Sequence, residues 1–219
     1  GLIDAAFGKD FLDESPICTH CGGLGYVGTQ MCSCLQELCR QEQQKELSSL
    51  LKMGEETFDH FDLDWYSPKP DPDGIRPREL MELAYESCLQ YARGFGRDHK
   101  SLLFTGGTGL GKTFLSTCIA REVSEQGFSV VYDTAAHIFQ QFESGKFGRD
   151  NPFEEDPDRE INRYLNCDLL IMDDLGTEMT SSVSNASLYQ LLSTRLTAGR
   201  GCVFITNQPY EELRRRYPP

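Results

Sequence analysis

The sequence predicts an α/β fold, in which a parallel sheet flanked by helices follows a small cysteine-rich module. Three observations predict this fold class. From Leu102 onward, short apolar runs alternate with amphipathic segments, which is the pattern of consecutive βαβ units. A glycine-rich loop joins the first apolar run to the first of these helices, and two close cysteine pairs lie near the N-terminus.

The alternating segment defines the elements of the core. We expect strands at residues 102–105, 128–132, 168–172 and 202–206, and helices at 112–126, 135–144, 182–198 and 210–216. An earlier helix should begin at Pro77, because proline suits the first turn of a helix. Continuous apolar runs such as Leu169–Met172 are typical of parallel strands covered on both faces. A ligand site is then expected at the carboxyl ends of the strands.

The loop after the first strand carries the clearest chemical signal. Gly106, Gly111, Lys112 and Thr113 satisfy G-x-x-x-x-G-K-[ST], the P-loop pattern of nucleotide-binding proteins. Glycines let backbone N–H groups curl around phosphate oxygens, and the following helix N-terminus favours negative charge. The alternative is a glycine-rich turn that happens to precede a helix, but both flanks fit the motif. The predicted binding residues are Gly106, Gly107, Thr108, Gly109, Leu110, Gly111, Lys112, Thr113 and Phe114.

This motif predicts ATP and Mg²⁺ as ligands, with Lys112 on the β- and γ-phosphates and the Thr113 hydroxyl on the metal. Asp173 and Asp174 end the third strand of the core. We expect Asp173 to hold Mg²⁺, directly or through water, and Asp174 to act as a general base or to orient the attacking water. Asn207, after the fourth strand, is expected near the γ-phosphate. Singly, such residues are also common at surface strand ends and turns.

Five of the nine cysteines lie within residues 18–39. Two close pairs, Cys18 with Cys21 and Cys32 with Cys34, can supply four thiolates to a tetrahedral zinc ion. The second pair has the less common C-x-C spacing, so Cys39 could replace one of its members. The alternative is a group of buried free thiols, since cysteine packs as a small hydrophobe. We expect thiols or metal ligands rather than disulfides.

Composition and charge limit the class of protein. The chain has 39% hydrophobic residues and no apolar run long enough for a membrane span, and no secretory signal opens it. We therefore expect a cytoplasmic protein. A net charge of −13 argues against tight binding to DNA by the protein alone and leaves room for local or weak contacts. We expect two domains, the cysteine module with a connecting helix (1–53, the helix at 35–53) and the ATPase core (54–219).

Three stretches together resemble the DnaC/DnaI helicase-loader family of AAA+ proteins, which are related to DnaA and IstB: the P-loop, Asp173–Glu178 and Ile205–Leu213. The cysteine module and Thr57–Asp62 resemble the upstream region of such proteins. The resemblance implies ATP-controlled delivery of the replicative hexameric helicase onto single-stranded DNA, with self-association through the AAA+ domain. It also implies that Asn207 is the first sensor and that Phe58–Leu63 lies near the adenine.

The resemblance is incomplete at the C-terminus. AAA+ proteins carry an arginine finger after the first sensor, and this sequence ends at Pro219 before one appears. The resemblance therefore implies C-terminal truncation and weak hydrolysis. Arg195 lies in a finger-like Ser-Thr-Arg-Leu segment but precedes the sensor, so we interpret it as a surface helix residue. Two alternatives stay open: an IstB-like transposition ATPase that acts on duplex DNA, and a non-hydrolysing, ATP-bound interaction scaffold.

Overall fold

The computed structural model describes residues 18–39, 41–42, 56–96, 101–147, 157–178 and 181–217. The chain divides into two compact units, Gly1–Glu42 and Gln43–Pro219. Residues 33–39 and 41–42 are helical, and the rest of the predicted connecting helix lies outside the described residues. The predicted domain boundary near residue 54 also falls there, so it stays a prediction.

The second unit is built on four parallel strands. In spatial order they are β3 (Leu102–Phe104), β6 (Gly201–Ile205), β5 (Leu169–Asp173) and β4 (Val130–Thr134). Each neighbouring pair is parallel, which confirms the predicted fold class. The strand bounds lie within two residues of those expected from the sequence. Because all four strands run the same way, their carboxyl ends meet at one edge of the sheet.

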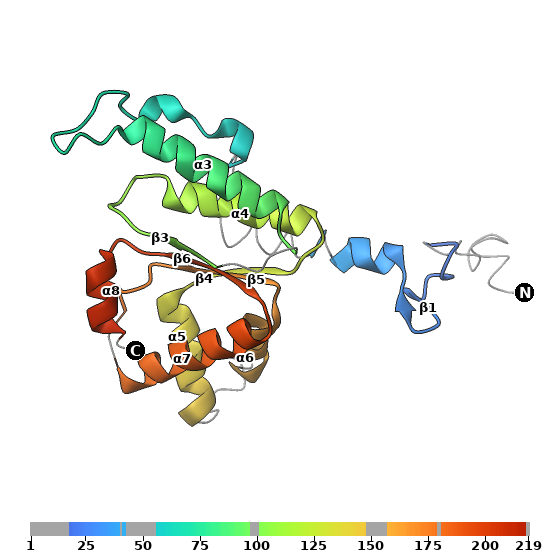
Figure 1. Ribbon diagram of the computed structural model, residues 1–219. Coiled ribbons are helices and arrows are strands. Elements are labelled where there is room, and N and C mark those ends of the chain that lie inside the picture. The colour runs from blue at the N-terminus through green and yellow to red at the C-terminus, as the bar shows by residue number, and fades with distance from the viewer. Residues whose placement is uncertain are drawn as a thin grey trace, which may run out of the picture. The chain divides into compact units, whose positions relative to one another are not determined.

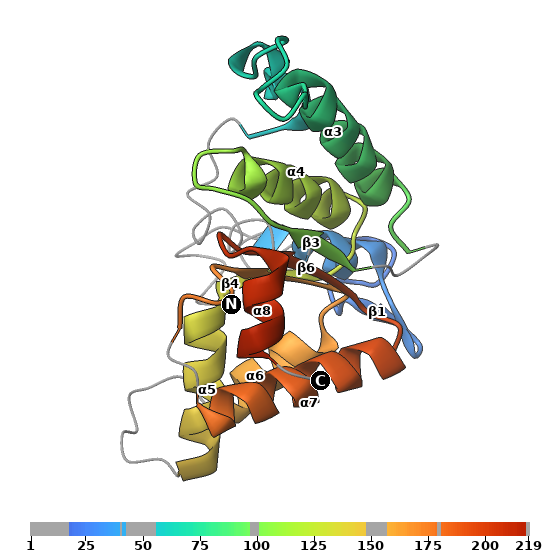
Figure 2. The ribbon, with the colours of Figure 1, turned by 60° about the vertical axis from the view of Figure 1, so that its left-hand side comes forward.

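Helices cover both faces of this sheet (Figures 1 and 2). On one face lie α3 (Pro77–Arg93) and α4 (Lys112–Glu125), and on the other α5 (Ala135–Phe147), α6 (Pro157–Asn166) and α7 (Ser182–Thr197). Two short 3₁₀ helices, η1 (Phe58–His60) and η2 (Leu63–Trp65), precede α3, and α8 (Tyr210–Arg216) follows β6. Helix α3 begins at Pro77, as predicted. The connection after β3 lies on a different face from the connections after β4 and β5, so the fold has a switch point beside the P-loop.

Strand β5 shows why its sequence is continuously apolar. Leu169 and Ile171 pack in the core cluster under α3 and α4, whereas Leu170 and Met172 pack in the cluster under α5 and α7. All four side chains are fully buried. Successive residues of a strand point to opposite faces, so a strand between two helical layers needs apolar residues at every position.

Arg195 corrects one sequence-based expectation. It lies on α7, but its side chain is fully buried rather than on the surface. The guanidinium donates to the carbonyl oxygens of Tyr164 at 2.7 Å and Gly201 at 2.6 Å, among other acceptors. The sequence interpretation was wrong because the helical pattern around Arg195 does not reveal that carbonyl groups from two other elements converge on this position.

The first unit contains a small antiparallel hairpin, β1 (Tyr26–Val27) and β2 (Gln30–Met31), in which Tyr26 pairs with Met31. Within the described residues of the whole chain, no helix combines the length and apolar character that crossing a membrane requires.

Candidate functional site: a phosphate-binding pocket and a four-cysteine cluster

The P-loop adopts a conformation that its glycines make possible. Gly109 and Gly111 have φ angles of 75° and 84°, a region that residues with a Cβ rarely occupy. Gly111 immediately precedes α4, and a Cβ built on it would lie 2.6 Å from the Tyr66 hydroxyl oxygen. The chain therefore turns sharply into α4, whose first-turn N–H groups carry the positive end of the helix dipole.

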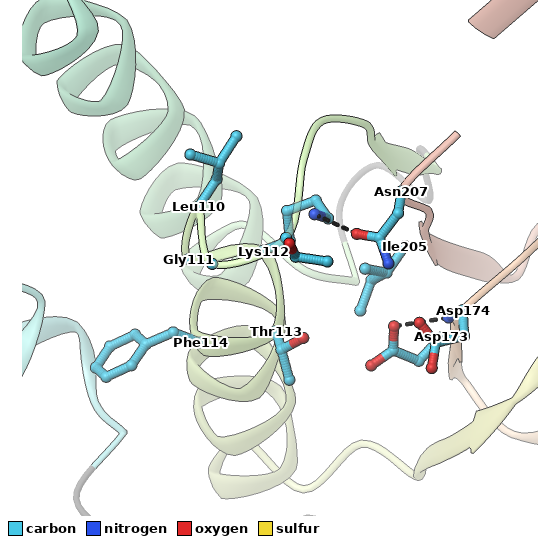
Figure 3. Close-up of a pocket in the computed structure, with 11 residues that line it drawn as sticks. Leu110, Gly111, Lys112, Thr113, Phe114, Asp173, Asp174, Ile205 and Asn207 are labelled. Atoms are coloured by element: carbon cyan, nitrogen blue, oxygen red, sulfur yellow. Dashed lines mark hydrogen bonds between the residues drawn. The ribbon is translucent and has the colours of Figure 1, made fainter. Parts of the chain in front are cut away.

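A pocket opens in front of this helix, at the carboxyl edge of the sheet (Figure 3). It brings together all of the predicted catalytic residues and most of the predicted P-loop residues. Its lining consists of Thr108, Gly109, Leu110, Gly111, Lys112, Thr113, Phe114, Asp173, Asp174, Ile205 and Asn207. Gly106 and Gly107 are not among the lining residues; their carbonyl oxygens accept hydrogen bonds from Lys112. Ile205 lines the pocket but was not predicted.

Lys112 connects the P-loop to the end of β6. Its ammonium group donates to the carbonyl oxygens of Gly106 at 2.9 Å and Gly107 at 2.6 Å, and to Asn207 Oδ1 at 2.8 Å (Figure 3). Lys112 and Asn207 are 95 positions apart in the chain, yet the fold places them in direct contact. The Lys112 ammonium and the Asn207 amide therefore line the same pocket as the P-loop backbone.

Asp173 is held at both carboxylate oxygens. Its Oδ1 accepts the backbone N–H of Asp174 at 2.7 Å, and its Oδ2 accepts a hydrogen bond from the hydroxyl of Tyr132 on β4. Burial raises the pKa of Tyr132, and the hydrogen bond to Asp173 raises it further. The phenol therefore stays protonated and donates to the carboxylate.

Asp174 has an unusual backbone. Among the described residues it is the one non-glycine residue with a positive φ, at 54°. Such strain is found preferentially at functional sites. Burial raises the pKa of Asp174, the neighbouring Asp173 charge raises it further, and Lys112 opposes both effects. A carboxyl group with a raised pKa is a better proton acceptor, which suits the predicted role of general base.

Thr206 ties the strand ends together behind these residues. Its fully buried hydroxyl donates to the carbonyl oxygen of Leu175 at 2.6 Å, and its N–H donates to that of Phe104 at 3.0 Å. The N–H of Leu175 donates in turn to Ile205. The loop after β5, the end of β6 and the end of β3 thus form one connected support for Asp173, Asp174 and Asn207.

An aromatic cluster adjoins the P-loop on the other side of α4. Phe61 stacks with Tyr66 and Tyr85 and lies 5.6 Å from Phe114, ring centre to ring centre. The Phe114 side chain extends away from Asp173 and Asn207 (Figure 3). The Tyr66 hydroxyl donates to the carbonyl oxygen of Leu110 in the P-loop at 3.2 Å. The segment predicted to lie near an adenine is therefore adjacent to the loop, although that role stays a prediction.

The first unit gathers the four predicted cysteines. The sulfur atoms of Cys18, Cys21, Cys32 and Cys34 all lie within 4.8 Å of one another, with Cys18 and Cys32 at 3.8 Å and Cys21 and Cys34 at 3.4 Å. A tetrahedral zinc ion with Zn–S bonds of about 2.3 Å holds its sulfurs about 3.8 Å apart. Cys39 is exposed and does not belong to the cluster. None of the nine cysteines is in a disulfide in this structure.

The thiols of the cluster differ in acidity. Burial raises the pKa of Cys21, but hydrogen bonds from the Gly25 N–H and from Cys34 outweigh it and lower that pKa to about 7. Hydrogen bonds to Cys21, together with burial, raise the pKa of Cys34 to about 12. The Gly25 N–H lies 3.2 Å from the Cys21 sulfur. The N–H donor and the lowered pKa of Cys21 favour its thiolate, the form of cysteine that binds a metal.

Comparison with known proteins identifies the family. A family model described as "IstB-like ATP binding protein" matches residues 31–217. The chain belongs to this family. It is therefore a member of an ATP-binding family with the AAA+ fold, and it is distantly related to DnaC helicase loaders.

The curated relatives support that relationship. The chain is 29% identical over 125 residues to "Replicative helicase loader DnaC" of Buchnera aphidicola subsp. Baizongia pistaciae, over 57% of this chain and 50% of that protein. It is 28% identical over 130 residues to the protein of the same name from Escherichia coli K12, over 59% and 51%. The chain thus spans about half the length of these relatives. A crystal structure of the DnaC helicase loader is similar with a TM-score of 0.53 and 22% identity, over 73% of this chain and 88% of that one. This last likeness concerns the fold.

Besides Ile205, two residues that contact the site escaped the sequence analysis. Tyr132 lies within an apolar strand and reads there as a core residue, and Tyr66 lies in a turn-rich segment far from the P-loop. No local pattern marks either residue. Each gains its contact with the site, Asp173 for Tyr132 and Leu110 for Tyr66, through the packing of distant elements.

Proposed function

We propose that this protein is an Mg²⁺-dependent ATPase of the cytoplasm that acts as a replicative helicase loader. The observation that carries the ATPase part is the convergence of Lys112, Asp173, Asp174 and Asn207 on the pocket in front of the P-loop. The loader part draws support from the helicase-loader relatives. The helicase and single-stranded DNA would be the partners, and self-association through the AAA+ domain would assemble the active form.

Each residue has a role that its position supports. Backbone N–H groups of residues 107–112 would surround the phosphates, and the Lys112 ammonium would neutralise charge on the β- and γ-phosphates. Asn207, next to Lys112, would bind the γ-phosphate or the attacking water. Asp174 would accept the proton of that water. The aromatic cluster of Phe61, Tyr66 and Phe114 would lie beside the adenine.

Thr113 and Asp173 fit an Mg²⁺ ion, which prefers oxygen ligands. Both side chains line the pocket, and the Asp173 carboxylate is already oriented by two donors. The Thr113 hydroxyl and Asp173, directly or through water, would hold the metal. When bound, Mg²⁺ would neutralise charge on the phosphate oxygens.

Substitutions separate binding from hydrolysis. Asp174→Asn keeps the shape of the side chain but removes its basicity, so we expect ATP to bind normally and hydrolysis to be lost. Lys112→Ala should bind ATP much more weakly. Isothermal titration with ATP and phosphate release assays measure the two properties. Normal hydrolysis by Asp174→Asn would show that another group activates the water.

The loader role is tested by binding to the helicase. The tagged chain is incubated with the replicative helicase of its own host, with and without ATP, and Lys112→Ala is the control with weakened ATP binding. We expect nucleotide-dependent association of the wild type. No association in either condition contradicts the loader role. Filaments on duplex DNA would instead favour the alternative of an IstB-like transposition ATPase, which the IstB-like family match keeps open.

We also propose that Cys18, Cys21, Cys32 and Cys34 bind one structural zinc ion, and that this module contacts the partner. Elemental analysis of the purified protein should find about one zinc per chain. Cys18→Ser should lose it, and Cys39→Ser, which lies outside the cluster, should retain it. Equal zinc content in the two variants would contradict the site.

A further inference from the structure

Tyr132 occupies a position that connects the core to the candidate metal site. It lies on β4 and is 8% exposed, and its ring packs in the core cluster beneath α4. Thr134 of β4 pairs with Asp173 of β5, so Tyr132 stands two residues before the level of Asp173. Residues at this spacing share one face of a sheet. The Tyr132 hydroxyl thus reaches Asp173 from below, on the face that α4 covers.

The hydrogen bond fixes one half of the Asp173 carboxylate. Tyr132 donates to Oδ2, and the N–H of Asp174 donates to Oδ1. Two donors on different oxygens restrict rotation of the carboxylate plane. Each oxygen still has a lone pair available, since a carboxylate offers about four acceptor positions. Asp173 can therefore be oriented by the protein and ligate a cation at the same time.

We propose that Tyr132 is a positioning residue for Mg²⁺: its hydroxyl holds Asp173 in the orientation in which that carboxylate binds the metal or its water ligands. This inference rests on the proposed Mg²⁺–ATP site. Groups that hydrogen-bond to metal ligands typically change metal affinity by about 10- to 100-fold when they are removed. Tyr132 is not among the residues that line the pocket, so it would act on the metal through Asp173.

The fold offers a matched control in Tyr164. This tyrosine of α6 is also buried, and its hydroxyl also donates to an aspartate, Asp133 Oδ2, at 2.7 Å. Asp133 lies next to Tyr132 on β4, so its side chain points to the opposite face of the sheet. Tyr164→Phe therefore removes the same chemical group from a similar environment without affecting Asp173.

The experiment measures Mg²⁺ directly. A fluorescent, non-hydrolysable ATP analogue is bound to each variant in EDTA and then across a Mg²⁺ titration, and thermal unfolding is recorded in parallel. For Tyr132→Phe we expect unchanged nucleotide affinity in EDTA. The Mg²⁺ concentration at the midpoint of the titration should be about tenfold higher than for the wild type. For Tyr164→Phe we expect the wild-type Mg²⁺ curve. If the two variants have the same Mg²⁺ curve, the role of Tyr132 is structural only and the inference is overturned.

Asp173→Asn separates this inference from the proposed site. If Asp173→Asn weakens the Mg²⁺ dependence and Tyr132→Phe does not, only the role of Tyr132 fails. If Asp173→Asn binds Mg²⁺ and nucleotide like the wild type, the metal assignment and the role of Tyr132 fail together. When both are correct, Tyr132→Phe has no further effect in the Asp173→Asn background, because the group it orients no longer ligates the metal.

Discussion

Lys112 and Arg195 are two cations that donate to backbone carbonyl oxygens at opposite ends of the parallel strands. Each is a cation whose charge is met by backbone carbonyl oxygens. Lys112 binds two P-loop carbonyls and Asn207, and it lines an open pocket. Arg195 is fully buried, and its six contacts join it to carbonyls and thiols: Tyr164, Cys167, Asp168, Gly201 and Cys202.

The difference teaches how a cation is assigned to function or to stability. The Arg195 guanidinium donates to carbonyl oxygens at the C-terminal end of α6 and just after it. The helix dipole favours a positive charge at this end. Arg200 continues this cap by donating to Leu165 at 2.7 Å. Lys112 has a flexible stem and lines the open pocket, so under the proposed function its ammonium would move from the carbonyl oxygens to a phosphate. Burial and the number of occupied donors, rather than charge, distinguish the structural role of Arg195 from the role proposed for Lys112.

The largest effect is expected for Arg195→Leu. Several carbonyl oxygens would lose their donors, at about 1–3 kcal/mol each when they stay buried and unpaired. We expect a loss of about 3–4 kcal/mol in the free energy of unfolding, measured by chemical denaturation. Arg214→Leu, at an exposed position of α8, serves as the control and should change stability by less than about 0.5 kcal/mol. If Arg195→Leu does not fold, Arg195→Lys gives an intermediate loss. If Arg195→Leu is as stable as the control, the hydrogen bonds of Arg195 contribute no more to stability than a surface residue does.

The next largest effect is expected for Lys112→Ala, which should change ATP binding rather than stability. This change should weaken ATP binding by on the order of 100-fold, because hydrogen bonds to charged groups contribute about 1.5–3 kcal/mol. Stability should stay near that of the wild type. Titration calorimetry with ATP and a thermal melt test both parts, and the exposed Lys69→Ala is the control. A large loss of stability with unchanged ATP affinity would mean that Lys112 is a structural cation like Arg195.

A smaller effect is expected for Gly111→Ala, which tests how far the P-loop residue before Lys112 depends on glycine. The positive φ of Gly111 and the contact with the Tyr66 hydroxyl both oppose a Cβ, so we expect a loss of about 1–2 kcal/mol in stability. Gly109→Ala has a similar φ but nothing within 4 Å of its Cβ, and it should lose less. Adding Tyr66→Phe should recover part of the Gly111→Ala defect. Equal losses in the two glycine variants would argue that the contact with Tyr66 is unimportant.

The smallest effect is expected for Arg200→Leu. Arg200 is less buried than Arg195 and donates to Leu165 and to the Asn166 side chain. Water can replace it, so we expect a loss of about 1 kcal/mol in the free energy of unfolding. A loss as large as that of Arg195→Leu would show that the cap of α6, rather than burial, determines the stability of this edge.

The sequence by itself determined the parallel α/β class, the P-loop and the order of Lys112, Asp173, Asp174 and Asn207. These features depend on local pattern: a buried parallel strand needs a continuous apolar run, and a phosphate loop needs glycines at fixed spacing. The four cysteines of the cluster were also predictable, since two close pairs on tight turns can converge on one point. In each case the physical requirement lies within a few neighbouring residues.

Tertiary structure decided what the local pattern could not. Arg195 is buried because the end of α6, the residues before β5 and the start of β6 supply its acceptors, and those of α6 lie about 30 positions away in the chain. Tyr132 reaches Asp173 across 41 positions, so its neighbours in the chain do not reveal the contact. A side chain that acts through a partner distant in sequence can be assigned only when the strands and helices are packed, because the partner's position is a property of the fold.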